Sequence, residues 1–135
     1  MRYMCLVYLD EEKMVAFAKD RGAVGAFEKA VVAYDQELND KGVLVMASPL
    51  KRVREAVTIR VRDGRMSATD GPFAETKEQL GGFMLIDVRD LNEAIALAER
   101  SPLARIGSIE VRPAGHPGWP AEHDMRKARA PRCTR

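Results

Sequence analysis

The chain has 135 residues, of which 46% are hydrophobic and 31% are charged, and its formal net charge is +2. This length and balance are typical of one soluble domain with its own core, and no apolar run is long enough to span a bilayer. The first apolar run is too short for a signal peptide, because it ends at Asp10-Glu11-Glu12. We therefore expect a cytoplasmic protein with no membrane partner.

The first forty residues predict a strand followed by helical structure. Residues 2–9 form a compact apolar run rich in strand formers, and residues 13–19 fit a short helical turn. In residues 23–41 apolar side chains recur at steps of three and four, which is typical of one face of a helix. The opposite, polar face of that helix carries Glu28, Lys29, Asp35 and Gln36.

The middle of the chain predicts a buried strand and then a hairpin. Gly42 fits the residue that ends a helix with a positive φ, and residues 43–46 form the next apolar strand. Residues 56–62 alternate between apolar and polar side chains, as in a half-buried strand. Asp63-Gly64 is a two-residue turn signal, so residues 65–69 should return antiparallel to this strand.

The last third of the folded part predicts a strand, a helix and a final strand. Residues 83–88 are apolar apart from Asp87, and Asp90 then provides a helix cap with Glu93 three residues further on. The last strand is expected at residues 106–111. The helix should bury a stripe formed by Leu91, Ala94, Ile95 and Ala98.

This order of elements predicts an α+β, ferredoxin-like fold, βαββαβ with an inserted β-hairpin. Two helices can cover only one face of such a sheet. The strands at residues 2–9 and 83–88 carry apolar side chains on both faces, so the second face also needs a cover. The sheet of a second copy is the simplest cover, which predicts a homodimer.

The chemistry-bearing residues gather in residues 70–82, where Asp-Gly-Pro breaks the chain sharply. The candidate catalytic residues are Asp70, Glu75 and Lys77, since a carboxylate can act as general base and an ammonium can hold an anionic group. The full candidate ligand-binding set is Asp70, Phe73, Glu75, Thr76, Lys77 and Glu78.

From the residue types alone, a second and structural interpretation is favoured. Asp70 completes a turn, Phe73 plugs the core, and the charged residues from Glu75 to Glu78 form a solvated loop with local ion pairs.

The run DGPFAETKEQLGG and the strand after it closely resemble the signature of DGPF proteins in the YciI-related superfamily. The resemblance extends from residue 2 to residue 113. It implies a YciI-related, ferredoxin-like domain at residues 1–114, of the dimeric α/β-barrel type, followed by a Pro/Gly-rich, basic tail at residues 115–135. Some members are linked with extracytoplasmic-function sigma factors.

Other relatives in this superfamily look like lyases that use a His–Asp pair as acid and base. This chain has no histidine before His116, so any proton transfer would fall to a carboxylate tuned by burial.

Cofactors and metals are not expected. Cys5 and Cys133 lie at opposite ends of the chain and make neither a disulfide framework nor a metal set, and Cys5 fits a buried strand residue. His116 and His123 have no ligand spacing typical of a metal site. The sequence also has no glycine motif that cradles phosphate, since Gly81-Gly82 leads into a strand.

Two functions of different classes remain. The first is a dimeric small-molecule-binding protein with lyase- or isomerase-like activity that uses the DGPFAETK loop. The second is a non-catalytic regulatory or interaction module linked to transcription, in which the loop is structural and the basic tail contacts nucleic acid.

Overall fold

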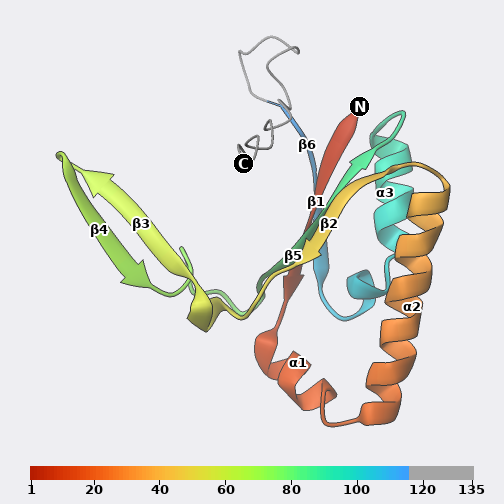
Figure 1. Ribbon diagram of the computed structural model, residues 1–135, viewed down its shortest axis with the longest axis horizontal. Helices are drawn as coiled ribbons and strands as arrows, with labels where there is room; N and C mark the ends of the chain where they lie inside the picture. Colours follow the sequence, from red (N-terminus) through yellow and green to blue (C-terminus); the bar gives the residue numbers. More distant parts are fainter. Residues whose placement is uncertain (116–135) are drawn as a thin grey trace, which may run out of the picture.

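A computed structural model describes residues 1–115 of the chain as an α+β fold with antiparallel sheets (Figure 1). Among these residues no helix is long and apolar enough to cross a membrane. The elements in chain order are β1 (Arg2–Leu9), α1 (Glu11–Phe17), α2 (Arg21–Asp40), β2 (Leu44–Pro49), η1 (Val53–Glu55), β3 (Val57–Arg62), β4 (Arg65–Asp70), β5 (Gln79–Asp87), α3 (Leu91–Arg100), η2 (Pro102–Arg105) and β6 (Ser108–Pro113).

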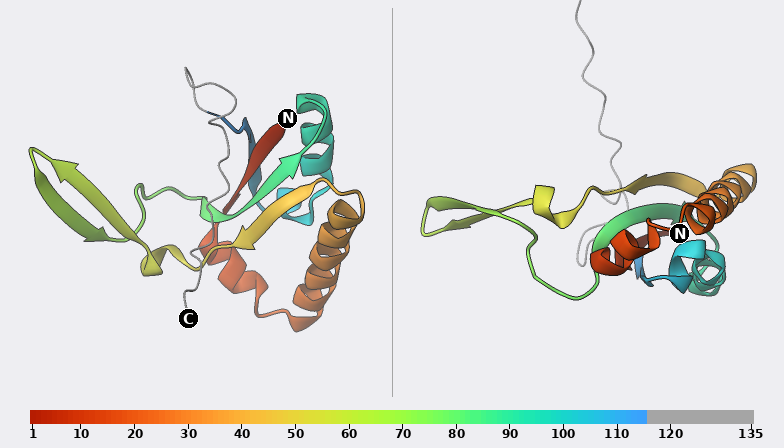
Figure 2. Two further views of the ribbon diagram at one scale, coloured as in Figure 1. Left: turned by 45° about the horizontal axis from the view of Figure 1, so that its top comes forward. Right: turned by 90° about the horizontal axis from the view of Figure 1, so that it is seen from below.

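The main sheet has four strands in the order β2-β5-β1-β6, and every neighbouring pair is antiparallel. This order is compatible with the expected ferredoxin-like plan. The hairpin β3–β4 is inserted between β2 and β5 and forms a separate two-stranded sheet. Helices α2 and α3 lie on one side of the main sheet, as Figures 1 and 2 show.

The core lies between the sheet and helices α2 and α3, because alternate residues of β1 and β5 point toward the helices. Tyr3, Cys5 and Ile86 are almost fully buried in this layer. From α2, Tyr34 donates a hydrogen bond from its hydroxyl to the backbone oxygen of Leu97 in α3 at 2.7 Å. Burial raises the pKa of the Cys5 thiol to about 11, so this cysteine is a structural residue and a poor nucleophile.

Two predicted helices need correction, the first in its starting residue and the last in its buried stripe. The first helix begins at Glu11 and not near residue 13, because the Asp10 carboxylate accepts hydrogen bonds from the backbone N–H groups of Glu12 and Lys13. In α3 the cap by Asp90 is as expected, with the N–H of Glu93 at 2.9 Å from its carboxylate oxygen.

The buried stripe of α3 differs from the predicted one. Ala94 and Ala98 are buried, but Leu97 is the third buried side chain, while Leu91 and Ile95 are 44% and 48% exposed. The helix is therefore rotated toward Leu97, where it meets Tyr34 of α2.

The face of the main sheet opposite the helices has no covering element among residues 1–115 (Figure 2). The register puts Met4 opposite Leu85 and Leu6 opposite Phe83, so these side chains share that face. They are only half-buried, in contrast to their neighbours on the helix side. We name the apolar part of this surface the open sheet face, and it is formed by Met4, Leu6, Tyr8, Met46, Phe83 and Leu85. Glu110 and Arg112 of β6, opposite Leu6 and Met4, lie beside it.

Candidate functional site

The loop between β4 and β5 contains eight residues of the predicted site run, residues 71–78. β4 ends at Asp70, and Gly71 has a φ of 108°, which favours glycine. The N–H of Gly71 donates to the backbone oxygen of Ala56 at 2.7 Å, and the Thr58 hydroxyl donates to the backbone oxygen of Gly71 at 2.9 Å. The turn is thus tied to β3. The loop is shorter than the sequence predicts, because strand β5 begins at Gln79 and not at residue 83.

Three of the predicted ligand-binding residues make local contacts. Phe73 is 80% exposed, and the guanidinium of Arg60 lies 5.6 Å from its ring centroid. Thr76 donates from its hydroxyl to the backbone oxygen of Glu78 at 2.6 Å. The Glu78 carboxylate in turn accepts a hydrogen bond of 2.5 Å from the hydroxyl of Ser108.

The three candidate catalytic residues, Asp70, Glu75 and Lys77, are all exposed. Asp70 ends β4 opposite Val57, whereas Glu75 and Lys77 lie on the loop. The structure therefore does not gather these three side chains in a buried cluster.

A groove of about 760 Å³ lies beside this loop, at the base of the hairpin β3–β4. From the predicted set, Phe73 and Thr76 line it. The opposite wall includes Tyr8 and Leu80, which pair with each other across β1 and β5. Asp70, Glu75, Lys77 and Glu78 are not among its lining residues. The loop therefore contributes one aromatic ring and one hydroxyl group to the walls of the groove.

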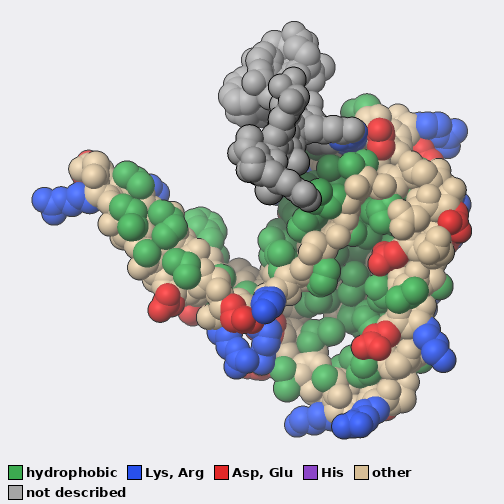
Figure 3. All heavy atoms as spheres, in the orientation of Figure 1, with side chains coloured by type: hydrophobic (Ala, Val, Ile, Leu, Met, Phe, Trp, Pro, Cys, Tyr) green, Lys and Arg blue, Asp and Glu red, His purple; other side chains and the backbone are tan. Residues whose placement is uncertain are grey.

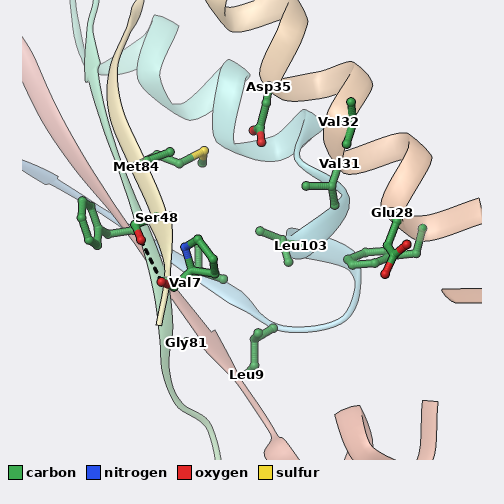
Figure 4. Close-up of a pocket in the computed structure, with 15 residues that line it drawn as sticks. Val7, Leu9, Glu28, Val31, Val32, Asp35, Ser48, Gly81, Met84 and Leu103 are labelled. Atoms are coloured by element: carbon green, nitrogen blue, oxygen red, sulfur yellow. Dashed lines mark hydrogen bonds between the residues drawn. The ribbon is translucent and has the colours of Figure 1, made fainter. Parts of the chain in front are cut away.

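A second cavity, of about 500 Å³, lies between α2 and the main sheet (Figure 4). Its walls are mostly apolar, and they combine side chains from the sheet, from α2 and from η2, including Val7, Val31 and Leu103. Hydrophobic side chains line the hollow beside α2 in the space-filling view of Figure 3. Gly81 and Gly82, the last two residues of the predicted site run, also line this cavity.

Those two glycines allow the chain to pack closely at the cavity wall. A Cβ atom on Gly82 would lie 3.1 Å from the backbone oxygen of Ser48, and one on Gly81 would lie 3.0 Å from Cδ1 of Leu9. The site run therefore contributes to the cavity through backbone and not through its charged side chains.

One carboxyl group of this cavity has a perturbed environment. Asp35 comes from α2 and its side chain points toward the cavity in Figure 4. Burial raises the pKa of the Asp35 carboxyl above its ordinary value. A carboxyl at the wall of a cavity is placed to exchange a proton with a bound molecule.

Sequence reasoning missed Asp35, because it assigned this residue to the polar face of α2. A signal was present: Glu28, Val31, Val32 and Asp35 are spaced as i, i+3, i+4 and i+7, so they share one helix face, and all four line the cavity. Two aliphatic residues between two acidic residues indicate a helix face that lies at the edge of the core and is only partly exposed to solvent.

Residues 1–115 contain no group of three His, Cys, Asp or Glu side chains arranged to hold an ion. His116, His123, Cys133 and the basic tail lie outside the described residues.

Replacing Glu75 or Lys77 by alanine tests the role of the loop charges. Because both side chains are exposed, we expect each change to alter the free energy of unfolding by no more than about 0.5 kcal/mol. Urea unfolding measures this. If the loop binds an anion, Lys77→Ala weakens that binding and Glu75→Ala changes its pH dependence, whereas a solvated loop leaves both unchanged.

Comparison with known proteins identifies the family. Residues 1–114 match the model of the YCII-related domain. An uncharacterised protein of Rhizobium meliloti (strain 1021) is 37% identical over 115 residues, which cover 84% of this chain and 91% of that protein.

A solved structure, the 5-chloro-2-hydroxyhydroquinone dehydrochlorinase of Burkholderia phenoliruptrix AC1100 in complex with 2,5-dihydroxybenzoquinone, matches with a TM-score of 0.49 and 14% identity. The match covers 87% of this chain and 96% of that one. A likeness at this level carries no weight for the activity of this chain. The domain match and the identity to the Rhizobium protein, in contrast, extend over most of the chain, and the chain belongs to the family of YCII-related domain proteins.

Proposed function

We propose that this chain is a homodimeric, cytoplasmic protein of the DGPF group that binds a small molecule in the cavity between α2 and the sheet. We also propose that it carries out lyase- or isomerase-like acid–base chemistry there. The observation that carries the proposal is the Asp35 carboxyl, which lies at the wall of a mostly apolar cavity and whose pKa is raised by burial.

The size and lining of the cavity favour a compact and mostly apolar ligand. Its volume of about 500 Å³ lies within the range of roughly 300 to 1,000 Å³ that is usual for small-molecule sites. Val7, Val31 and Leu103 form aliphatic walls, and the charged groups of the lining are the carboxyl groups of Glu28 and Asp35, which disfavour an anion. We therefore expect an uncharged ligand, for example a phenol, whose hydroxyl or acidic C–H group faces Asp35.

Asp35 supplies the proton transfer in this proposal. Burial raises the pKa of the Asp35 carboxyl above its ordinary value, and a carboxyl in contact with a ligand can take a proton from it and give the proton back. Residues 1–115 contain no histidine, so the step falls to a carboxyl in this proposal. In an isomerisation the carboxyl would remove a proton from the ligand and return it at another atom. In an elimination it would remove the proton and then protonate the departing group.

The signature loop has an auxiliary role in this proposal. Strand β5 continues from the loop groove, which Leu80 lines, to the cavity, which Gly81 and Gly82 line. Asp70, Glu75 and Lys77 remain candidates for attracting a ligand or holding an anionic group at the groove, together with Phe73 and Thr76, which line it.

The substitution Asp35→Asn tests the proposal. A carboxyl whose folded pKa lies above its unfolded value of about 3.9 contributes stability that is present below that value and is lost as the pH rises through the folded pKa. Asparagine does not ionise, so the substitution removes this loss of stability at higher pH. We therefore expect Asp35→Asn to melt at a higher temperature than wild type at pH 7, with no difference below about pH 3, and to lose ligand binding or turnover.

The matched control is Asp40→Asn, on the same helix but exposed, where the side chain accepts a hydrogen bond of 2.8 Å from Gln36. Asp40→Asn should change neither the melting temperature at pH 7 nor the binding or turnover of a ligand. Thermal shift against a panel of neutral phenols provides the binding readout. A panel that stabilises wild type and Asp35→Asn alike, with unchanged affinity, would rule out a role for this carboxyl.

The alternative function is a non-catalytic interaction module linked to transcription. The exposure of Asp70, Glu75 and Lys77 favours it, since an exposed loop is available to a macromolecular partner. A salt-dependent DNA-binding assay distinguishes this function from the first, because phosphate contacts weaken steeply as salt rises.

A further inference from the structure

The groove at the base of the hairpin β3–β4 differs in charge from the cavity between α2 and the sheet. Its charged lining residues are Lys51, Arg52 and Glu55, whereas those of the cavity are Glu28 and Asp35. Basic side chains gather beside acidic ones at the base of the hairpin in Figure 3. The cavity therefore disfavours an anion, while the groove offers two cations to bind one.

Arg52 is the cation that the rest of the structure holds in position. One carboxylate oxygen of Glu11, the first residue of α1, accepts a hydrogen bond of 2.9 Å from the backbone N–H of Val53. The other oxygen lies 3.7 Å from Nε of Arg52. Glu11 itself is not among the residues that line the groove. It therefore fixes the chain at Val53 and supports the guanidinium from outside the groove.

The contact with Glu11 leaves one edge of the guanidinium for a ligand. The contact is made through Nε, and no hydrogen bond joins the two terminal nitrogens of Arg52 to another residue of the described chain. These nitrogens can donate parallel hydrogen bonds to both oxygens of a carboxylate. By contrast, Nζ of Lys51 lies 4.0 Å from a carboxylate oxygen of Glu55, and the Lys51 side chain is 85% exposed. Such a surface lysine contributes little to a specific site, so Arg52 is the preferred anchor for a carboxylate.

The other walls of the groove suit an aromatic ring. Tyr8 of β1 and Phe73 of the loop line it, together with aliphatic side chains such as Leu50 and Leu80. Phe73 is 80% exposed, but the Arg60 guanidinium lies over its ring, 5.6 Å from the centroid, and helps to hold it there. Aromatic side chains bind a further ring by offset stacking or edge-to-face contact. The volume of about 760 Å³ is sufficient for a small aromatic molecule.

The hydroxyl group of the loop does not compete for the carboxylate. The Thr76 hydroxyl already donates its hydrogen to the backbone oxygen of Glu78, so toward a ligand its oxygen can only accept. A carboxylate is also only an acceptor, and the two groups therefore cannot bind each other. This directs the carboxylate of a ligand to Arg52 and its ring to Tyr8 and Phe73.

We propose that this groove is a second ligand site, specific for an aromatic carboxylate that Arg52 binds through both carboxylate oxygens. The ring of the ligand packs against Tyr8 and Phe73. This inference goes beyond the proposed function, because it involves neither Asp35 nor the cavity. It also gives the signature loop a definite role, in which its aromatic ring, and not its charged side chains, contacts the ligand.

Cinnamate and its uncharged amide, cinnamamide, test the role of charge. The two molecules have the same ring and nearly the same shape, but only cinnamate can form a charge-assisted pair with Arg52. In an NMR titration of the full chain, we expect cinnamate to bind at least about tenfold more tightly than cinnamamide. The backbone signals that shift should belong to residues 50–56 and 72–80.

Two neighbouring arginines provide the variant and its matched control. Arg52→Gln removes the charge and the paired donors, so we expect it to weaken cinnamate binding at least about tenfold. Arg54 is also exposed but does not line the groove, and Arg54→Gln should leave the affinity unchanged within about twofold. Phe73→Ala is a second variant, because a side chain that is 80% exposed is not needed for folding. It should weaken cinnamate binding at least about threefold through the loss of the aromatic contact.

The groove proposal is wrong if cinnamate fails to bind the wild type at millimolar concentration, or if it binds Arg52→Gln and Arg54→Gln equally well. It is also wrong if Asp35→Asn abolishes cinnamate binding, because the ligand then occupies the cavity. We expect Asp35→Asn instead to bind cinnamate as tightly as wild type does, although it should lose the ligand of the cavity. Failure of the groove proposal thus leaves the cavity proposal standing, and the reverse also holds.

Discussion

Replacing Gly107 by alanine is expected to destabilise the fold by about 3 kcal/mol or more. A Cβ atom at this position would lie 2.2 Å from the backbone oxygen of Tyr8 and 2.7 Å from Cδ2 of Leu9. The nearest obstacle is backbone in the central strand β1, which cannot rotate away as a side chain could. Urea unfolding followed by circular dichroism measures the loss.

The control for this substitution is Gly25→Ala in α2, where no atom lies within 4 Å of the added Cβ. Alanine has a better helix propensity than glycine, so this change should stabilise the fold by about 0.5–1 kcal/mol. If Gly107→Ala proves as stable as wild type, then the close approach of Gly107 to the backbone of Tyr8 does not constrain the fold.

The helices and strands of this fold could be predicted because the repeat of apolar side chains that indicates each element lies within that element. The alternation in residues 56–62 and the Asp63-Gly64 turn predict the hairpin, and both turn residues have positive φ, at 52° and 73°. The expected helix at residues 23–41 corresponds closely to α2, Arg21–Asp40. Such features follow from backbone preference and periodicity alone.

Features that depend on how elements dock were not predictable in the same way. Ile95 has the spacing of a buried residue but is half exposed, because α3 rotates to bring Leu97 against Tyr34. The start of β5 at Gln79 depends on pairing with Leu9 and Tyr8, which lie seventy residues earlier. Neither contact leaves a local trace in the sequence.

The candidate site illustrates the same division. The loop residues Glu75 and Lys77 attract attention by their chemistry, yet both are exposed. The carboxyl with a raised pKa belongs to Asp35, whose burial depends on the space that α2 leaves above the sheet. Residue type can indicate which groups are reactive, but only the packing of distant segments decides which group is desolvated.

Introducing a charge on the open sheet face is expected to convert the protein from dimer to monomer. Leu85 lies near the centre of this face, between Met4 of β1 and Met46 of β2. Leu85→Glu would bury an unpaired carboxylate twice in a symmetric dimer, and one such charge costs about 3–5 kcal/mol. The dimer dissociation constant should therefore rise at least about a hundredfold, as measured by analytical ultracentrifugation.

The protomer itself should tolerate this change, because Leu85 is only half-buried within it. Leu91→Glu is the matched control: it makes the same substitution at a leucine that is 44% exposed, on the helix side of the sheet. Leu91 begins α3, where an acidic residue is favourable, so this variant should stay folded and dimeric. If Leu85→Glu and Leu91→Glu have the same oligomeric state as wild type, the open sheet face is not the dimer interface, and the apolar side chains of β1 and β5 on that face require another cover.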